Sequence, residues 1–192
     1  FFKYTKEEIL SDQSKINKLI RENGYLIADG ATGTNLFAMG LESGYPPELW
    51  NLEKPENVAK NHKSFIDAGS DIILTNSFGA NKFRLKLHNA QDETYIINYS
   101  AAEIANNVTK KSNREIIIAG SIGPSGELIA PLGDLSEEDA INGFSEQIKG
   151  LVDGGVDLLW IETMSAEEEL NCAIKAGKQF DIPMICTYSF DT

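Results

Sequence analysis

Short apolar runs alternate with amphipathic segments along the chain. The runs are rich in Ile, Leu and Val and do not alternate polar with apolar residues, which is typical of strands buried on both faces. They predict strands at residues 25–28, 71–74, 115–119, 157–161 and 183–186. Apolar residues at helical spacing predict helices at 5–23, 56–68, 79–87, 93–112, 136–154 and 165–179. We expect one domain over residues 1–192, with residues 1–24 as an N-terminal helical extension.

The alternation of strand and helix, without a hairpin signal, predicts a parallel α/β fold. Two architectures of this class differ in strand order. A flavodoxin-like open sheet that binds a small molecule has the order 2-1-3-4-5, whereas consecutive units of a (β/α)8 barrel have the order 1-2-3-4-5. A complete eightfold barrel needs about 250 residues. The 192 residues would therefore supply about the first five βα units of such a barrel.

Small, polar and acidic residues gather where the predicted strands end. Asp29-Gly30-Ala31-Thr32 follows the first strand, Thr75-Asn76-Ser77 the second and Glu162-Thr163 the fourth. In parallel α/β folds the ligand site lies at the carboxyl ends of the strands. The sequence therefore predicts a small-molecule site at this edge of the sheet.

The residue types at this edge suit a zwitterionic amino acid. The carboxylates of Asp29 and Glu162 could face an ammonium group, and backbone N–H groups near Gly30 could hold a carboxylate. Residues 29–34 lack the Lys-Ser/Thr pair of a Walker loop and the spacing of a dinucleotide-binding loop. A tight βα turn at residues 29–34 and a Glu162 that caps the next helix remain the alternatives.

Charge and composition exclude several classes of partner. With 17 Lys+Arg against 29 Asp+Glu, the net charge of −12 disfavours binding to nucleic acid or to an anionic membrane surface. No apolar run approaches the ~20 residues of a membrane span. Cys172 and Cys186 cannot build a disulfide framework, so we expect a reducing, cytoplasmic location and two packing cysteines. His62 and His88 are expected at the surface.

Four motifs, in order along the chain, resemble those of the homocysteine S-methyltransferase domain family. They are residues 29–34, 74–80, 120–124 and 162–164. The resemblance runs from about Leu26 to Phe190, and residues 123–133 resemble most the cobalamin-dependent methionine synthase branch. The family fold is a (β/α)8 barrel, and its reaction transfers a methyl group to the sulfur of homocysteine.

The resemblance also implies cofactors and partners. The family binds the sulfur to zinc through three cysteines, which are expected downstream of Thr192, so no metal ligand is assigned here and Cys172 and Cys186 are not zinc ligands. Methylcobalamin is the implied methyl carrier, with homocysteine and a corrinoid-carrying domain as partners. The chain is expected to be inactive alone. A non-catalytic module that retains the amino-acid pocket is the alternative function.

Residue by residue, the resemblance assigns the substrate-binding positions but no catalytic residue. Asp29 and Glu162 would face the homocysteine ammonium, and Thr75 and Ser77 would line the pocket. Backbone N–H groups of residues Gly30, Ala31 and Thr32 would hold the carboxylate. Many relatives have Thr at the position of Ser77, which retains a hydroxyl.

Overall fold

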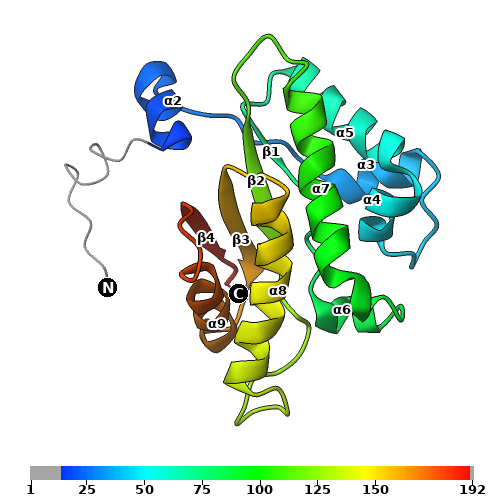
Figure 1. The fold of residues 1–192 in the computed structure, drawn as a ribbon, viewed down its shortest axis with the longest axis vertical. Helices are drawn as coiled ribbons and strands as arrows, with labels where there is room; N and C mark the ends of the chain where they lie inside the picture. The colour runs from blue at the N-terminus through cyan, green and yellow to red at the C-terminus, as the bar shows by residue number, and fades with distance from the viewer. Residues whose placement is uncertain (1–13, 191–192) are drawn as a thin grey trace.

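The computed structural model describes residues 14–190, and its centre is one parallel sheet. The strands are β1 (Ile72–Leu74), β2 (Ile117–Ile122), β3 (Leu158–Met164) and β4 (Met184–Tyr188), in the order β1-β2-β3-β4 (Figure 1). Strands that are consecutive in the chain are therefore neighbours in the sheet. This order is the one expected of consecutive barrel units, and it excludes the flavodoxin-like order for the part of the chain described.

The first predicted strand, residues 25–28, is not a strand in the structure. Ala28 forms only an isolated parallel bridge with Ile72 at the β1 edge of the sheet. The Asp71 carboxylate accepts the Ile27 N–H at 3.0 Å and so takes a donor that a longer ladder would use. The prediction of five strands is therefore corrected to four strands and a bridge, which still lies in the first position of the sequential order.

The predicted helices are present, with ends that shift by a few residues. Those with predicted counterparts are α2 (Lys15–Asn23), α5 (Pro55–Ala68), α6 (Lys82–Lys86), α7 (Thr94–Thr109), α8 (Glu137–Asp153) and α9 (Glu167–Gly177). The part of the first predicted helix before residue 14 lies outside the described residues. Sequence analysis missed α3 (Thr32–Ala38), α4 (Trp50–Glu53) and the short 3-10 helices η1 (Pro47–Leu49) and η2 (Gln91–Glu93).

Successive residues of each strand pack on opposite sides of the sheet. Ile73, Ile118 and Leu159 belong to the large core on one side of the sheet. Helices α7 and α8 cover this side (Figure 1). Ile117 and Leu158 belong to a smaller cluster on the other side. This alternation within continuous apolar runs explains why the strands show no polar period in the sequence.

Helix α2 closes the smaller cluster at the amino ends of the strands. Its Leu19 is buried in the cluster, and its Lys15 ammonium lies 2.8 Å from the Asp157 carboxylate. The Asp157 carboxylate also accepts the Ile118 N–H at 2.8 Å, and the Asp71 carboxylate accepts the Ile27 N–H in the same way. At two places in the fold, therefore, an aspartate just before a strand accepts a backbone N–H from the segment beside it.

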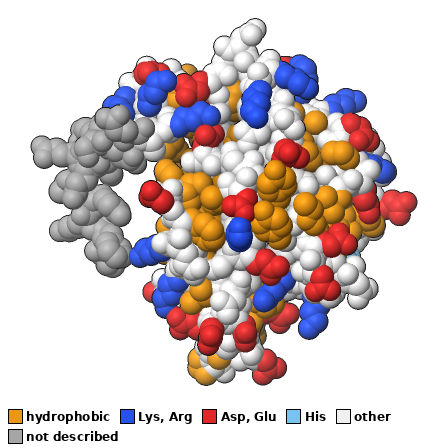
Figure 2. All heavy atoms as spheres, viewed as in Figure 1, with side chains coloured by type: hydrophobic (Ala, Val, Ile, Leu, Met, Phe, Trp, Pro, Cys, Tyr) orange, Lys and Arg blue, Asp and Glu red, His pale blue; other side chains and the backbone are white. Residues whose placement is uncertain are grey.

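Charges of both signs are interspersed over the face that Figure 2 shows, with hydrophobic side chains between them. The excess of acidic residues therefore does not form a single acidic field on this face. Among the described helices, none combines the length and apolarity that crossing a membrane requires.

The structure corrects two of the four predictions for the histidines, which were expected at the surface, and the cysteines, which were expected to be packed. His62 on α5 is fully buried, and neither of its ring nitrogens has a hydrogen-bond partner. Cys186 on β4 is exposed rather than packed. His88 is exposed and Cys172 is buried, as expected.

Because burial lowers the pKa of His62 from 6.5 to about 4, this residue should make the protein less stable in acid. Between these two values the unfolded chain binds a proton that the folded chain does not, so stability is lost as the pH falls through this range. We expect His62 to account for about 2 kcal/mol of lost unfolding free energy between pH 7.5 and 5.

Urea unfolding at the two pH values measures this difference. His62→Leu should remove that part of the pH dependence, whereas His88→Gln, a change at an exposed histidine, should leave it. Equal pH dependence in the two variants would contradict the prediction.

Candidate functional site

A cavity of about 440 Å³ lies at the carboxyl ends of the strands. All seven predicted site residues line it, namely Asp29, Gly30, Ala31, Thr32, Thr75, Ser77 and Glu162. Its wall also contains residues that sequence analysis did not assign to the site, among them Pro47, Glu48, Asn76, Phe78 and Ser121. The structure therefore brings together segments that are more than 130 positions apart in the sequence.

Asp29 enters the cavity directly after the Ala28 bridge. Its carboxylate accepts the Leu74 N–H at 3.0 Å, and its own N–H donates to the Ile72 carbonyl at 2.9 Å. Burial, with a smaller contribution from the negative charge of Glu162, raises the pKa of Asp29 to about 7, although the hydrogen bond from the Leu74 N–H opposes the rise. The carboxyl is therefore poised to titrate near neutral pH.

Glu162 comes from the end of β3, where the strand departs from regular pairing. The β3–β4 register shifts between Ile161 and Met164, and Thr163 has a φ of 59°. That left-handed conformation is uncommon for a β-branched residue and is typical of positions with a functional constraint. The irregularity lies next to Glu162, whose Oε1 accepts the Ser121 hydroxyl at 2.6 Å.

Hydroxyl groups join the ends of β1 and β2 beneath the cavity. Thr75 Oγ1 and Ser77 Oγ lie 2.6 Å apart, and Ser77 Oγ donates to the Ser121 carbonyl at 2.8 Å. The Ser121 N–H donates to Thr75 Oγ1 at 3.1 Å. Since Ser121 also donates to Glu162, one network fixes three strand ends and leaves little rotational freedom to any of these side chains.

Glu48 is the residue of the cavity wall that sequence analysis most clearly missed. It lies on η1, it is only 5% exposed, and its Oε1 accepts the Gly79 N–H at 2.7 Å. Burial raises its pKa, and the Gly79 hydrogen bond and the charges of Arg84 and His88 only partly oppose that rise. The local sequence offers one signal, an acidic residue between Pro47 and the apolar Leu49.

The charge of this cavity is one-sided. Three carboxyl side chains line it, those of Asp29, Glu48 and Glu162, and no Lys, Arg or His is among the described residues of its wall. Backbone N–H groups that precede and open α3 adjoin the same space, where the first amides of a helix have no intrahelical partner. The arrangement can therefore accept a ligand cation beside an anion, as a zwitterion requires.

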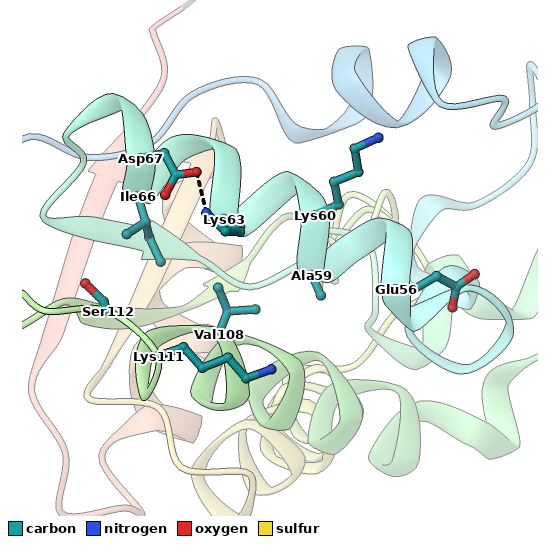
Figure 3. A pocket seen from close by; sticks show the side chains of 9 residues that line it. All are labelled: Glu56, Ala59, Lys60, Lys63, Ile66, Asp67, Val108, Lys111 and Ser112. Carbon is teal, nitrogen blue, oxygen red and sulfur yellow. Dashed lines mark hydrogen bonds and ion pairs between the residues drawn. The ribbon is translucent and has the colours of Figure 1, made fainter.

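A second hollow lies between α5 and α7, away from the strand ends (Figure 3). Ile66 and Val108 project into it, and Lys60, Lys63 and Lys111 stand at its rim. The Lys63 ammonium is paired with Asp67. The groove contains none of the predicted site residues and none of the strand-end hydroxyls, so its chemistry differs from that of the cavity.

The described residues do not fit a metal centre. Within residues 14–190, no three His, Cys, Asp or Glu side chains come together as a metal would require. Cys172 is buried on α9, whereas Cys186 is exposed on β4. Neither cysteine lines the cavity. No step at a metal can therefore be derived from the described residues.

Comparison with known proteins assigns this architecture to a family. The family model described as homocysteine S-methyltransferase matches residues 26–192. Methionine synthase from Mycobacterium tuberculosis (strain ATCC 25618 / H37Rv) is 27% identical over an alignment of 165 residues that covers 80% of this chain and 14% of that protein. The chain therefore spans a small part of that relative.

Solved structures show the same fold. The metallated form of the homocysteine methyltransferase MmuM from Escherichia coli has a TM-score of 0.75 and 23% identity, over 91% of this chain and 66% of MmuM. The oxidized form has a TM-score of 0.74 and 23% identity, over 90% of this chain and 64% of MmuM. The four-stranded parallel sheet thus corresponds to a part of the MmuM structure.

We expect the Asp29 carboxyl to titrate with a midpoint of about 7. Carboxyl ¹³C NMR across pH 4–9 measures it, with Asp29→Asn to assign the resonance. Glu162→Gln should lower the midpoint, because a neighbouring negative charge is removed. Since the folded pKa lies above the unfolded value of 3.8, Asp29 becomes less favourable to stability as the pH rises through this range. The stability of Asp29→Asn relative to the original protein should accordingly be higher at pH 8 than at pH 5. A titration midpoint near 4 for the Asp29 carboxyl would contradict the assignment.

Proposed function

The chain belongs to the homocysteine S-methyltransferase family, and we propose that its cavity binds the amino-acid end of homocysteine in a methionine-forming methyl transfer. The observation that carries this proposal is the pair of carboxyls, Asp29 and Glu162, in a wall with no basic side chain among its described residues. Taking a carboxylate partly out of water without a cation is costly, and a ligand ammonium would relieve that cost for these two half-buried side chains. The name of the similar methionine synthase supports methionine as the product.

Each residue has a distinct proposed role in holding the substrate. Asp29 and Glu162 receive the ammonium, and Ser121 orients Glu162 through its 2.6 Å hydrogen bond. Thr75 and Ser77 line the pocket with hydroxyls that are already tied to one another. The positive charge of the ammonium favours the ionised form of Asp29, so binding near pH 7 is coupled to release of a proton from this carboxyl.

The backbone before and at the start of α3 is proposed to hold the substrate carboxylate. Gly30, Ala31 and Thr32 line the cavity next to Asp29 in the sequence. A carboxylate placed there would lie next to the ammonium site, which fits the short separation of the two groups in an α-amino acid. This contact recognises any α-amino acid, so selection for homocysteine must come from the part of the site that receives the sulfur.

For the whole protein we propose a (β/α)8 barrel, of which this chain supplies about the first five βα units. The sequential strand order and the likeness to a part of MmuM support this architecture. The bridge at Ala28 stands in the place of the first strand, followed by β1 to β4. The cavity would then lie on the carboxyl side of the barrel, where the sites of such enzymes are found.

Activation of the sulfur is not assigned to residues of this chain. A thiolate is far more nucleophilic than a thiol, and the MmuM relative has a metallated form, which indicates a metal in the family. Zinc, with cysteine ligands outside residues 1–192, and methylcobalamin as the methyl carrier remain our proposals. That residues 1–192 alone transfer no methyl group stays a prediction. Free thiols at Cys172 and Cys186 support the proposed cytoplasmic location.

Glu162→Gln should weaken homocysteine binding to the complete protein without reducing its metal content. Loss of one charge-assisted contact of about 1.5–3 kcal/mol corresponds to a dissociation constant roughly 10- to 100-fold higher. Titration calorimetry with homocysteine measures the constant, and elemental analysis measures the metal. Glu103→Gln, at an exposed position on α7, is the matched control.

An unchanged affinity in Glu162→Gln would contradict the assigned role. Homocysteine binding without methyl transfer to it, under any donor tested, would favour the non-catalytic amino-acid module instead.

A further inference from the structure

Glu48 lies between two cavities. On one side is the acidic cavity at the strand ends, and on the other is a cavity of about 310 Å³ next to Arg84 and His88. Pro47 and Phe78 belong to both walls as well. Within residues 14–190 no ion pair to Glu48 is found. From outside its own residue, its carboxyl accepts the Gly79 N–H at 2.7 Å.

The contact between Glu48 and Gly79 leaves no room for a side chain at position 79 while Glu48 keeps its place. A Cβ built on Gly79 would lie 2.8 Å from Glu48 Oε1 and 3.3 Å from Arg84 Nε. Real Cβ atoms essentially never approach another heavy atom below 3.0 Å. Glycine therefore permits the carboxyl oxygen to reach the backbone N–H, which is also buried.

A second set of buried bonds joins the same two segments. Asn51 Nδ2 donates to the Asn76 carbonyl at 2.7 Å, and Asn76 Nδ2 donates to Asn51 Oδ1 at 3.0 Å. Asn76 Nδ2 also donates to the Pro47 carbonyl at 2.8 Å. The segment of η1 and α4 is thus hydrogen-bonded to the loop after β1 at two places, at Asn76 and at Gly79.

The loop after β1 carries two of the substrate-facing hydroxyls. Gln147 of α8 donates to the Ser77 carbonyl at 2.8 Å. Thr75 and Ser77 connect through Ser121 to Glu162. A shift of this loop would therefore be transmitted to the whole hydroxyl network rather than to one side chain.

We propose that Glu48 is a positioning residue, which holds the loop of residues 75–79 in register with the strand ends by accepting the Gly79 N–H. Its influence on homocysteine rests on the proposed function, whereas its hold on the loop does not. What matters is the acceptor oxygen in a buried position, since the raised pKa indicates an environment that disfavours the charged form.

Two replacements separate the acceptor from the volume of the side chain. Glu48→Gln keeps an oxygen that can accept the Gly79 N–H, whereas Glu48→Met fills similar space and offers no such oxygen. Glu42→Met, at an exposed position in the loop before η1, is the matched control. All three are made in the complete protein and compared by thermal unfolding to establish that each one folds.

The first measurement is the ¹H–¹⁵N spectrum without substrate. In Glu48→Met the amides of Gly79, Ser77 and Ser121 should shift, whereas Glu48→Gln and Glu42→Met should retain the Ser77 and Ser121 shifts. Unchanged Ser77 and Ser121 amides in Glu48→Met would overturn the proposal, whether or not the protein binds homocysteine.

The second measurement is the methyl-transfer rate against homocysteine concentration. We expect Glu48→Met to raise KM for homocysteine about 10- to 100-fold with kcat changed much less, because a small misplacement of binding groups costs that much. Glu48→Gln should restore KM to near the original value. If Glu48→Gln is impaired as strongly as Glu48→Met, the charge of Glu48 matters rather than its acceptor oxygen, and the proposal is wrong. If Glu48→Met does not fold, a raised KM in Glu48→Gln would still overturn the proposal.

Discussion

The position of β2 between β1 and β3 is the constraint on which the cavity depends. Parallel pairing on both sides of β2 places Ser121 between the loop that follows β1 and the side chain of Glu162. Its backbone and hydroxyl are then used in three directions, toward Thr75, Ser77 and Glu162. Because successive side chains of a strand point to opposite faces, a register slip of one residue in β2 would point Ser121 into the apolar core on the helix side. The fold and the chemistry of the site are thus fixed by the same register.

The cavity concentrates acidic groups in a way that the fold must tolerate before any ligand binds. Asp29 and Glu48 both have raised pKa values, and burial is the main cause for each. Their hydrogen bonds to the Leu74 and Gly79 amides compensate only in part. The charged forms of these two carboxyls are therefore disfavoured, and under the proposed function the ligand ammonium would offset that cost at Asp29.

Most of the architecture could be predicted from the sequence because it follows from short-range patterns. Continuous apolar runs located β1 to β4, and the rule that parallel strands end at one edge brought Asp29, Thr75 and Glu162 into one site. The first strand could not be predicted correctly, because carboxylates take the ladder donors on both sides of the Ala28 bridge: Asp71 accepts the Ile27 N–H and Asp29 accepts the Leu74 N–H. That competition depends on residues more than 40 positions apart.

Two buried polar residues show a different limit of sequence analysis. The burial of Glu48 depends on Gly79, 31 positions away, and no local pattern encodes that partner. His62 did carry a signal, since it lies one helical turn from both Val58 and Ile66 on the buried face of α5. A surface position was predicted for His62 because its side chain is polar, although its place in the helix favours burial. Helical spacing was thus the better guide to burial than residue type.

The left-handed conformation of Thr163 has a consequence for how this site can change over time. A glycine at that position would relieve backbone strain of about 1–3 kcal/mol, so a search for more stable variants would favour it. The same glycine would loosen the turn beside Glu162 and widen the range of directions in which that carboxyl can point. Selection for robustness and selection for ligand recognition therefore pull this single position toward different residues.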